Sequence, residues 1–275
     1  MINGNTELIA HIGFPTHSFK SPMIYNPYFE SVGVNAVVVP FSCQVEQYPA
    51  FFRSVLALAN VRGALITMPH KVSTLALLDE ISPAAQIAGA CNAVKRKADG
   101  KLIGDMFDGE GFVRGIKRKG CKVVGAKVLI VGTGGVGCAI AASFAATGAD
   151  AIALFDTNTK SAEALRDRLL KHYPSLKTAT GSNNPTGFDI VVNATPLGMN
   201  VGDPLPVDVN LLLPNTFVGE VVMRDEMTTF LKAAVARGCQ YQVGTDMLFE
   251  QIPAYLEFFG FPSSNAERLR ALAQL

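Results

Sequence analysis

The sequence predicts an α/β protein of two domains, one of them a Rossmann-type dinucleotide-binding domain. Three features of one stretch support this prediction: an apolar run from Val128 to Val131, a glycine-rich turn directly after it, and an alanine-rich segment of helical composition from Cys138 onward. The apolar run is typical of a strand that is buried on both faces. A glycine turn between such a strand and a helix is the setting in which a dinucleotide binds.

The turn is expected to bind the cofactor through Gly132, Gly134, Gly135, Val136 and Gly137. Gly132 makes the tight turn, Gly134 lets a pyrophosphate approach the backbone, and Gly137 lets the helix pack closely on the strand. The phosphates are then expected at the free N–H groups of the helix N-terminus. Glycine-rich turns are common and many bind nothing, so this turn alone is a weak signal.

A second apolar strand, Ala151 to Phe155, ends in Asp156, about 24 residues beyond Gly132. A dinucleotide-binding fold places at this position the carboxylate that binds the adenine ribose. The alternative is that Asp156 only starts a turn or caps the helix expected at 159–170. The order of strand, glycine turn, helix, strand and acid favours the ribose-binding role.

The 275 residues allow one large domain or two of medium size, and the net charge is +1. This charge gives no electrostatic footprint for nucleic acid or for an anionic membrane surface. The first residues lack a signal-peptide pattern and no apolar run reaches the ~18 residues of a membrane helix, so a cytoplasmic location is expected. The five cysteines lack Cys-x-x-Cys spacing, which argues against a disulfide framework and a zinc site.

Strands and helices are expected to alternate in the first half, which indicates a mostly parallel or mixed sheet covered by helices. The strands are expected at 7–13, 35–40, 63–69 and 91–95, and the helices at 23–31, 45–58, 71–78 and 84–90. Ser21 is expected to cap the first helix, with Pro22 at its first position. Later strands are expected at 189–195, 216–222 and 240–243, and later helices at 111–119, 159–170, 228–237 and 247–275.

Several short motifs occur in order along the chain: Lys20-Ser-Pro22, Thr67-Met-Pro-His-Lys71, Gly89-Ala-Cys-Asn92, Gly104-Asp-Met-Phe-Asp-Gly109, the glycine turn, Asn193-Ala-Thr195, and Gly244-Thr-Asp-Met-Leu-Phe-Glu-Gln251. Through these motifs the chain resembles the shikimate dehydrogenase family over its whole length. The resemblance implies a substrate-binding domain of residues 1–107 plus 244–275 and a Rossmann NAD-binding domain of residues 108–243. It also implies a cleft where the two domains meet.

In this family a Lys–Asp pair acts on the hydroxyl that is oxidised at ring carbon 3 of shikimate, which implies the catalytic pair Lys71 and Asp108. Oxidising an alcohol by hydride loss requires a group that takes the hydroxyl proton, and the reverse reaction requires the same group as an acid. From the residues alone, Lys71 is more simply a solvated lysine at the start of a helix. The resemblance reverses that interpretation.

The resemblance also implies which residues surround the ligands. Those expected to hydrogen-bond the substrate are Ser21, Thr67, Asn92 and Gln251, with capping or turn chemistry as the alternative for each. Besides the glycine turn and Asp156, those expected at the cofactor are Asn193, Thr195, Val221 and Gly244. His17 and His70 flank the motifs and are interpreted as residues of the cleft rim or of the structure.

The sequence departs from the family pattern in its expected pocket. Phe19 stands where the first of two serines belongs, Leu65 and Met223 stand where Asn and Tyr are common, and Met106-Phe107 replaces Asn-Thr. Ser18 could replace the missing serine only if the loop shifts its register. The pocket is expected to have lost hydrogen-bonding groups, at ~1–3 kcal/mol for each unmet group, and to have gained apolar surface. Weak turnover of shikimate, or a modified substrate, is expected.

The predicted cofactor is NAD. Family members that use NADP carry an Asn-Arg-Thr-like triplet after the second cofactor strand, and its arginine pairs with the 2′-phosphate. This chain has Asp156-Thr-Asn158 there, and its nearest following cations are Lys160 and Arg166. A carboxylate accepts hydrogen bonds from the ribose hydroxyls of NAD but repels a 2′-phosphate.

The expected function is an NAD-dependent oxidoreductase acting on shikimate or a related ring carboxylate. The alternatives are a quinate or aminoshikimate dehydrogenase of catabolism or secondary metabolism, and a non-catalytic NAD-binding sensor, which has no need of Lys71 and Asp108. A purely structural protein leaves the glycine turn without an explanation. The expected partner is a small-molecule substrate, with no nucleic acid, membrane or metal, and a homodimer is left open.

Overall fold

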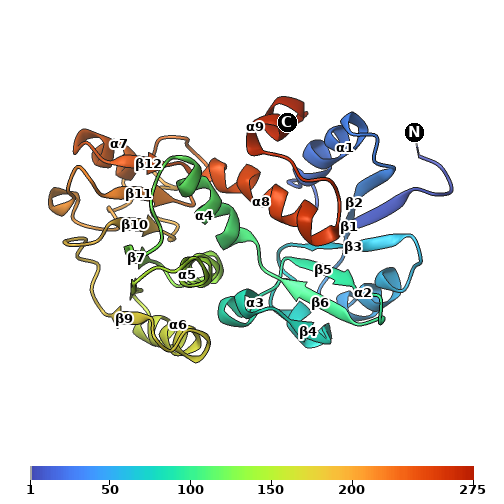
Figure 1. Cartoon of the computed structure of the whole chain (residues 1–275), viewed down its shortest axis with the longest axis horizontal. Helices are drawn as coiled ribbons and strands as arrows, with labels where there is room; N and C mark the ends of the chain where they lie inside the picture. The colour runs from blue at the N-terminus through green and yellow to red at the C-terminus, as the bar shows by residue number, and fades with distance from the viewer. Residues whose placement is uncertain (1) are drawn as a thin grey trace. The chain divides into compact units, whose positions relative to one another are not determined.

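The computed structural model describes residues 2–275, which form two compact units (Figure 1). The first unit contains the described residues up to Phe107 together with Ile252–Leu275, and the second contains Asp108–Gln251. The change from the second unit back to the first falls after Gln251, inside helix α8 (Gly244–Phe259), whereas the sequence places this limit before Gly244. Within residues 2–275, none of the helices combines the length and apolarity that crossing a membrane requires.

The first unit is built on a six-stranded mixed sheet with the strand order β2-β1-β3-β5-β6-β4. Its strands are β1 (Glu7–Gly13), β2 (Ala36–Ser42), β3 (Val61–Ile66), β4 (Glu80–Ile81), β5 (Ala93–Arg96) and β6 (Leu102–Asp105). Strand β5 runs antiparallel to β3 and β6, whereas the other paired strands run parallel. The carboxyl ends of β1, β3 and β6 therefore lie at the same edge of the sheet as the amino end of β5.

The helices of the first unit are α1 (Ser21–Ser31), α2 (Tyr48–Leu56), α3 (Pro83–Ala88), the 3₁₀ helix η1 (Ser73–Leu77) and α9 (Ala266–Leu272). The C-terminal segment returns to this unit, where the Tyr28 hydroxyl donates a 2.7 Å hydrogen bond to the Pro262 carbonyl. The predicted N-cap role of Ser21 is wrong, because Lys20 already has helical backbone angles and Ser21 is the first residue of α1.

The helix expected at 71–78 is also wrong as an α-helix, because the segment forms only η1. The hydroxyl groups of Ser73 and Thr74 both donate to the His70 carbonyl, at 3.1 and 2.8 Å. Local side-chain bonds of this kind compete with regular helical bonding. Strands β4, β6 and β9 (Lys177–Thr180) were not predicted. Strand β4 has only two residues, β6 lies in the stretch taken from the sequence as the domain junction, and β9 reads Lys-Thr-Ala-Thr, with little apolar character.

The second unit contains a parallel sheet with the strand order β12-β11-β10-β7-β8-β9. Its further strands are β7 (Lys127–Val131), β8 (Ala151–Phe155), β10 (Ile190–Asn193), β11 (Phe217–Glu220) and β12 (Gln240–Gln242). Counted along the chain, this is the Rossmann order 3-2-1-4-5-6. The chain builds outward from β7 to β9 and then returns to the other side of β7 with β10. Ligands of such sheets bind beside the carboxyl ends of the strands at this switch point.

The helices of the second unit are α4 (Asp108–Arg118), α5 (Gly135–Thr147), α6 (Thr159–His172), α7 (Thr229–Ala236), the 3₁₀ helix η2 (Val209–Leu211) and the first half of α8. Residues 137–145 of α5 are all buried, which explains why this helix is apolar on every side. Four of the five residues of β7 are buried as well, as predicted for a strand covered on both faces. The sequence therefore placed the centre of this unit correctly.

Candidate active site

The glycine turn joins β7 to α5 in the second unit. Gly132 has a φ of +100°, a conformation that L side chains rarely adopt, and its N–H donates to the Phe155 carbonyl at 2.7 Å. A Cβ at Gly137 would collide with the Gly132 carbonyl oxygen, so α5 packs directly on the turn. Gly134 and Gly135 are exposed and have no atom within 4 Å of an added Cβ. The space beside these two glycines can admit a phosphate.

The N-terminus of α5 supplies donors to that space. Gly134 is the N-cap residue, and no side chain caps the helix. The first N–H groups of a helix lack partners within the helix and attract anions. This end of the helix therefore fits a pyrophosphate, as the sequence predicts.

Asp156 follows β8 at the same edge of the sheet and is held there by three hydrogen bonds. Its Oδ2 accepts from the Thr133 N–H at 2.7 Å and from the Thr133 hydroxyl at 2.9 Å, and its Oδ1 accepts from the Asn158 N–H at 2.9 Å. Burial alone would raise the pKa of Asp156, but these hydrogen bonds outweigh it and lower the pKa. The carboxylate is therefore ionised at neutral pH and lies next to the glycine turn.

The loop after β10 lies on the other side of the switch point. A Cβ at Gly132 would be 2.7 Å from the Ala194 carbonyl oxygen, so the two loops touch. The Asn193 Oδ1 accepts hydrogen bonds from the N–H and the hydroxyl of Thr195, at 3.1 and 2.6 Å, and its Nδ2 donates to the Leu197 carbonyl at 2.9 Å. The side chain of Asn193 is thus occupied in shaping this loop, and Thr195 is half-buried within it.

Val221 and Gly244 lie beside the same loop. The Val221 N–H donates to the Asn193 carbonyl at 3.2 Å. Gly244 begins α8, where a Cβ would collide with the Val222 carbonyl oxygen. Val221 and Gly244 have no polar side chains, so only their backbone groups are available to a ligand near the carboxyl ends of β10 and β11.

Glu220, the last residue of β11, is a buried carboxyl group that the sequence interpretation missed. Its Oε2 accepts from the Thr228 hydroxyl at 3.0 Å, and within residues 2–275 its Oε1 has no hydrogen-bond partner. Burial raises its pKa to about 7, although hydrogen bonds from Thr228 and Asn193 act in the other direction. A glutamate inside the run Phe217-Val-Gly-Glu-Val-Val222 was the available signal.

In the first unit, three predicted residues gather at the edge formed by the ends of β3 and β5. Thr67 follows β3, and its N–H donates to the Ile12 carbonyl at 3.0 Å. Asn92, which is 1% exposed, precedes β5 and accepts at Oδ1 from the Phe107 N–H at 2.9 Å. Lys71 is half-buried, and its carbonyl accepts from the Cys91 N–H at 2.8 Å. The sheet therefore brings these three residues to one edge.

The side chain of His70 stabilises the turn that precedes Lys71. Its ring is fully buried and stacks on Tyr48, with centroids 3.9 Å apart and planes at 8°, and its Nε2 lies 2.8 Å from the Cys43 carbonyl oxygen. The Tyr48 hydroxyl lies 2.7 Å from Oγ1 of Thr74, which in turn donates to the His70 carbonyl. His70 was interpreted as a residue of the cleft rim or of the structure, and these contacts favour the structural role. His17 is exposed.

Asp108 and Gln251 belong to the second unit. Asp108 is the first residue of α4 and is 7% exposed, and a carboxylate is favourable at a helix N-terminus. The next residue, Gly109, packs so closely on α5 that a Cβ would collide with the Ala139 carbonyl. Gln251 lies against Gly111 of α4, and its Oε1 is buried with no hydrogen-bond partner in the described part of the chain.

The departures from the family pattern do not all enlarge an apolar pocket. Leu65 and Met106 are buried, with 4% and 2% of their surfaces exposed, so they offer a ligand little apolar surface. The Phe107 ring packs edge-on against Tyr255 and Phe258, at 5.0 and 5.4 Å between centroids. Leu65 and Met106 therefore add little exposed apolar surface, and the expectation of an apolar pocket stays a prediction.

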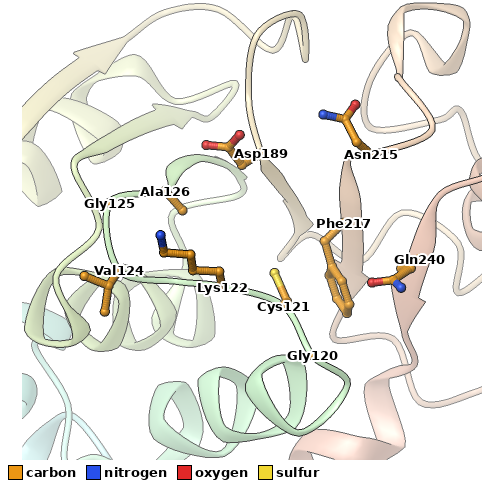
Figure 2. Close-up of a pocket in the computed structure, with 10 residues that line it drawn as sticks. All are labelled: Gly120, Cys121, Lys122, Val124, Gly125, Ala126, Asp189, Asn215, Phe217 and Gln240. Carbon is orange, nitrogen blue, oxygen red and sulfur yellow. The ribbon is translucent and has the colours of Figure 1, made fainter.

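A hollow of about 400 Å³ opens at the opposite, amino edge of the second sheet, and Figure 2 shows its lining residues. None of the predicted site residues lines it. Burial and the charge of Asp189 raise the pKa of the Cys121 thiol in this hollow to about 11, so the thiol stays protonated at neutral pH. Residues 2–275 also contain no group of His, Cys, Asp and Glu side chains that could hold a metal ion.

Known proteins resemble this chain in sequence and in fold. Residues 12–94 match the family model described as the shikimate dehydrogenase substrate binding domain. The chain is 36% identical over 257 residues to the shikimate dehydrogenase (NADP(+)) of Rubrobacter xylanophilus, and the alignment covers 91% of this chain and 89% of that protein. The chain belongs to the shikimate dehydrogenase family.

Two solved structures show how closely the family fold is kept. Shikimate 5-dehydrogenase from Listeria monocytogenes, in complex with shikimate and NAD, has a TM-score of 0.90 and 28% identity, covering 98% of this chain and 97% of its own. The ligand-free 5-ketofructose reductase of a Gluconobacter species has a TM-score of 0.89 and 26% identity, covering 98% of each chain. The predicted two-domain α/β fold is confirmed. These relatives are named for different substrates and cofactors, so membership of the family leaves both open.

Proposed function

We propose that the protein is an NAD-dependent oxidoreductase that interconverts a secondary alcohol on a hydroxylated ring of the shikimate type with its ketone. The observation that carries this proposal is the glycine-lined N-terminus of α5 at the switch point of a Rossmann sheet, in a chain whose first unit gathers Lys71, Thr67 and Asn92 at one sheet edge. A sheet built for a dinucleotide and a cluster of polar groups are the two parts that this reaction needs.

The protein's own residues are assigned to binding and proton transfer. Bound NAD supplies the hydride acceptor when the alcohol is oxidised. In the direction of oxidation, the neutral amine of Lys71 takes the hydroxyl proton and becomes an ammonium, and it returns the proton in the reverse direction. Asp108 is the acidic residue that the resemblance assigns to the same step. Thr67 and Asn92 are proposed to hydrogen-bond the other oxygens of the substrate. Gln251 is proposed for the same role, because its buried Oε1 has no partner within residues 2–275 and can accept a bond from a hydroxyl. Ser21, half-buried in the first turn of α1, is a further hydroxyl for this purpose.

The choice of NAD is supported by Asp156. Its ionised carboxylate lies beside the glycine turn, where a ribose hydroxyl could donate to it and a 2′-phosphate would be repelled. Arg166, the nearest arginine that follows, donates to Asp167 at 2.9 Å instead. Relatives include enzymes named for NADP, so this preference is a property proposed for this chain's own residues.

The alternatives within the class are oxidation of quinate or aminoshikimate, and outside the class a sensor that binds NAD without catalysis. A panel of ring alcohols assayed with NAD and NADP, followed by the absorbance of the reduced nicotinamide, tests the proposal. Turnover of a ring alcohol with NAD is the expected result. NAD binding without turnover of any alcohol or ketone in the panel would favour the sensor, and absence of NAD binding would contradict the proposal.

A further inference from the structure

Two aromatic rings lie at the end of β1, on the same sheet edge as Thr67. His11 belongs to β1, and Phe19 lies in the loop that leads from β1 to α1. Their ring centroids are 4.0 Å apart and their planes meet at 23°, so the rings are stacked. We call this pair the aromatic wall. His11 is 7% exposed and Phe19 is half-buried, so Phe19 is the member of the wall that a ligand can reach more easily.

The aromatic wall adjoins the residues proposed to bind the substrate. A Cβ at Gly13 would be 2.5 Å from the Thr67 Cγ2 and 2.8 Å from the Phe19 Cζ, so these two side chains meet over the same glycine. His11 lies close enough to Lys71 for the lysine charge to affect its ionisation. The wall therefore adjoins Thr67 and lies near Lys71, and Phe19 precedes the start of α1 by two residues.

The aromatic wall is uncharged at neutral pH. Burial, and to a smaller extent the charge of Lys71, lower the pKa of His11 to about 4. The face of an aromatic ring carries partial negative charge, which repels an anion and attracts the positive ends of C–H bonds. A carboxylate taken out of water at this place would need hydrogen-bond donors that a phenylalanine ring does not have.

The start of α1 supplies only some of the hydrogen-bond donors that a carboxylate would need. Pro22 has no N–H, and the Met23 N–H already donates to the Lys20 carbonyl at 3.0 Å. The Phe19 N–H donates to the Thr16 carbonyl at 3.0 Å. The hydroxyls of Ser18 and Ser21 and the exposed ammonium of Lys20 are also at this loop, and the side chain of Lys71 is assigned to the reacting hydroxyl. A carboxylate at the loop surface could pair with these groups, but it would find no hydrogen-bond donor on the Phe19 ring itself.

We infer that the aromatic wall selects an uncharged face of the substrate, so that the natural substrate is a neutral polyhydroxylated ring or ketose rather than a ring carboxylate. This inference rests on the proposed function, since it concerns the same site. The C–H face of the ring would pack on Phe19, and its hydroxyls would reach Thr67 and Asn92.

Shikimate and its methyl ester give a matched comparison, because they share the ring and its hydroxyls and differ only in whether the carboxyl group is a charged carboxylate or an uncharged ester. An uncharged cyclitol and an uncharged ketohexose complete the panel, assayed with NAD or NADH and the full-length protein. At least one uncharged compound is expected to exceed shikimate tenfold or more in kcat/KM. Phe19→Ser should reduce that ratio at least threefold, whereas Phe19→Leu, which stays apolar, should keep the preference for the uncharged compound.

Thermal denaturation of both variants shows whether each is folded. If shikimate is turned over as efficiently as every uncharged compound, the inference is overturned while the proposed oxidoreductase function stands. A wild-type preference that Phe19→Ser leaves unchanged also overturns the assignment to the wall. If no compound of either kind is turned over, the proposed function fails, and the inference fails with it.

Discussion

Thr133 donates two hydrogen bonds to a single oxygen of Asp156, one from its N–H at 2.7 Å and one from its hydroxyl at 2.9 Å. The glycine turn after β7 is thereby tied to the acid after β8, so the two parts of the proposed NAD site form one hydrogen-bonded unit. The same bonds lower the pKa of Asp156 and keep its negative charge at neutral pH.

Replacing Asp156 should reduce the preference of the protein for NAD over NADP. We expect the wild-type protein to prefer NAD over NADP by at least tenfold in kcat/KM, which is about 1.4 kcal/mol. Asp156→Asn keeps an oxygen that can accept from Thr133 but removes the charge that repels a 2′-phosphate, so most of the preference should disappear. Asp156→Ala should act in the same direction and also remove the acceptor.

Asp150 provides the control for this experiment, because it precedes β8 at the opposite end of the same strand and pairs with Lys177 at 3.0 Å. Asp150→Asn removes the same charge far along the strand and should leave the cofactor preference unchanged. Equal or better efficiency of the wild-type protein with NADP would show that Asp156 does not face the ribose.

Lys71→Ala should reduce turnover by about 10²–10⁴-fold, the usual contribution of a general acid–base group. Binding of NAD should stay near normal, because Lys71 belongs to the first unit and the glycine turn to the second. Single-turnover rates and NAD titration by fluorescence separate the two effects. Lys101→Ala removes an exposed lysine of the first unit and serves as the control. Turnover close to wild type in Lys71→Ala would remove the proposed mechanism.

The sequence was most informative where one short segment decides the structure. The turn at Gly132 and the acid at Asp156 depend on a strand, a helix and a second strand that follow one another, and their hydrophobic patterns are local. Lys71 and Asn92 were placed by resemblance, because nothing in their own segments shows that β3 and β5 meet at one edge.

Other features depend on contacts between distant segments, which a pattern along the chain does not show. The stack of His11 on Phe19 forms only because the loop after β1 folds back over its strand. Leu65 looked like a pocket residue, but its place in the middle of the sheet buries it. Asn26, on α1, was not singled out, although it bonds to an edge strand of the sheet.

Asn26→Val should expose that edge strand, β2, to association with other molecules. The Asn26 Oδ1 accepts from the Val38 N–H at 2.8 Å, and its Nδ2 donates to the Val38 carbonyl at 3.2 Å. These bonds occupy backbone groups on the outer side of β2, which would otherwise be free to pair with another strand. Loss of both should cost about 1–3 kcal/mol of stability and promote association.

Sedimentation velocity at several protein concentrations measures this effect. The sedimentation coefficient of the Asn26→Val protein should rise more with concentration than that of the wild type. Asn210→Val changes an exposed asparagine of the second unit and serves as the control. Unchanged sedimentation together with unchanged thermal stability would show that the side chain of Asn26 does not protect the edge.

Glu220 should make the stability of the protein depend on pH. Burial raises its pKa in the folded state from 4.5 to about 7, so between these values the folded protein holds a proton that the unfolded chain has lost. The free energy of unfolding must then fall as the pH rises from about 4.5 to about 7, by at most about 1.4 kcal/mol per pH unit, and become level above that range. Glu220→Gln cannot titrate and can still accept from Thr228. The melting temperature of Glu220→Gln minus that of the wild type should therefore be higher at pH 8 than at pH 5. The increase should be about 2–4 °C for each kcal/mol of stability that the wild type loses, in a unit of this size.

Thermal melts of wild type, Glu220→Gln and the exposed control Glu226→Gln, each at pH 5 and pH 8, test this expectation. Only Glu220→Gln should change its difference from the wild type between the two pH values, because Glu226 is solvated in both states. The difference should be larger at pH 8, since wild-type Glu220 is then ionised while its Oε1 lacks a hydrogen-bond partner within residues 2–275. Parallel pH profiles of wild type and Glu220→Gln would mean that this carboxyl group is not buried in the folded protein.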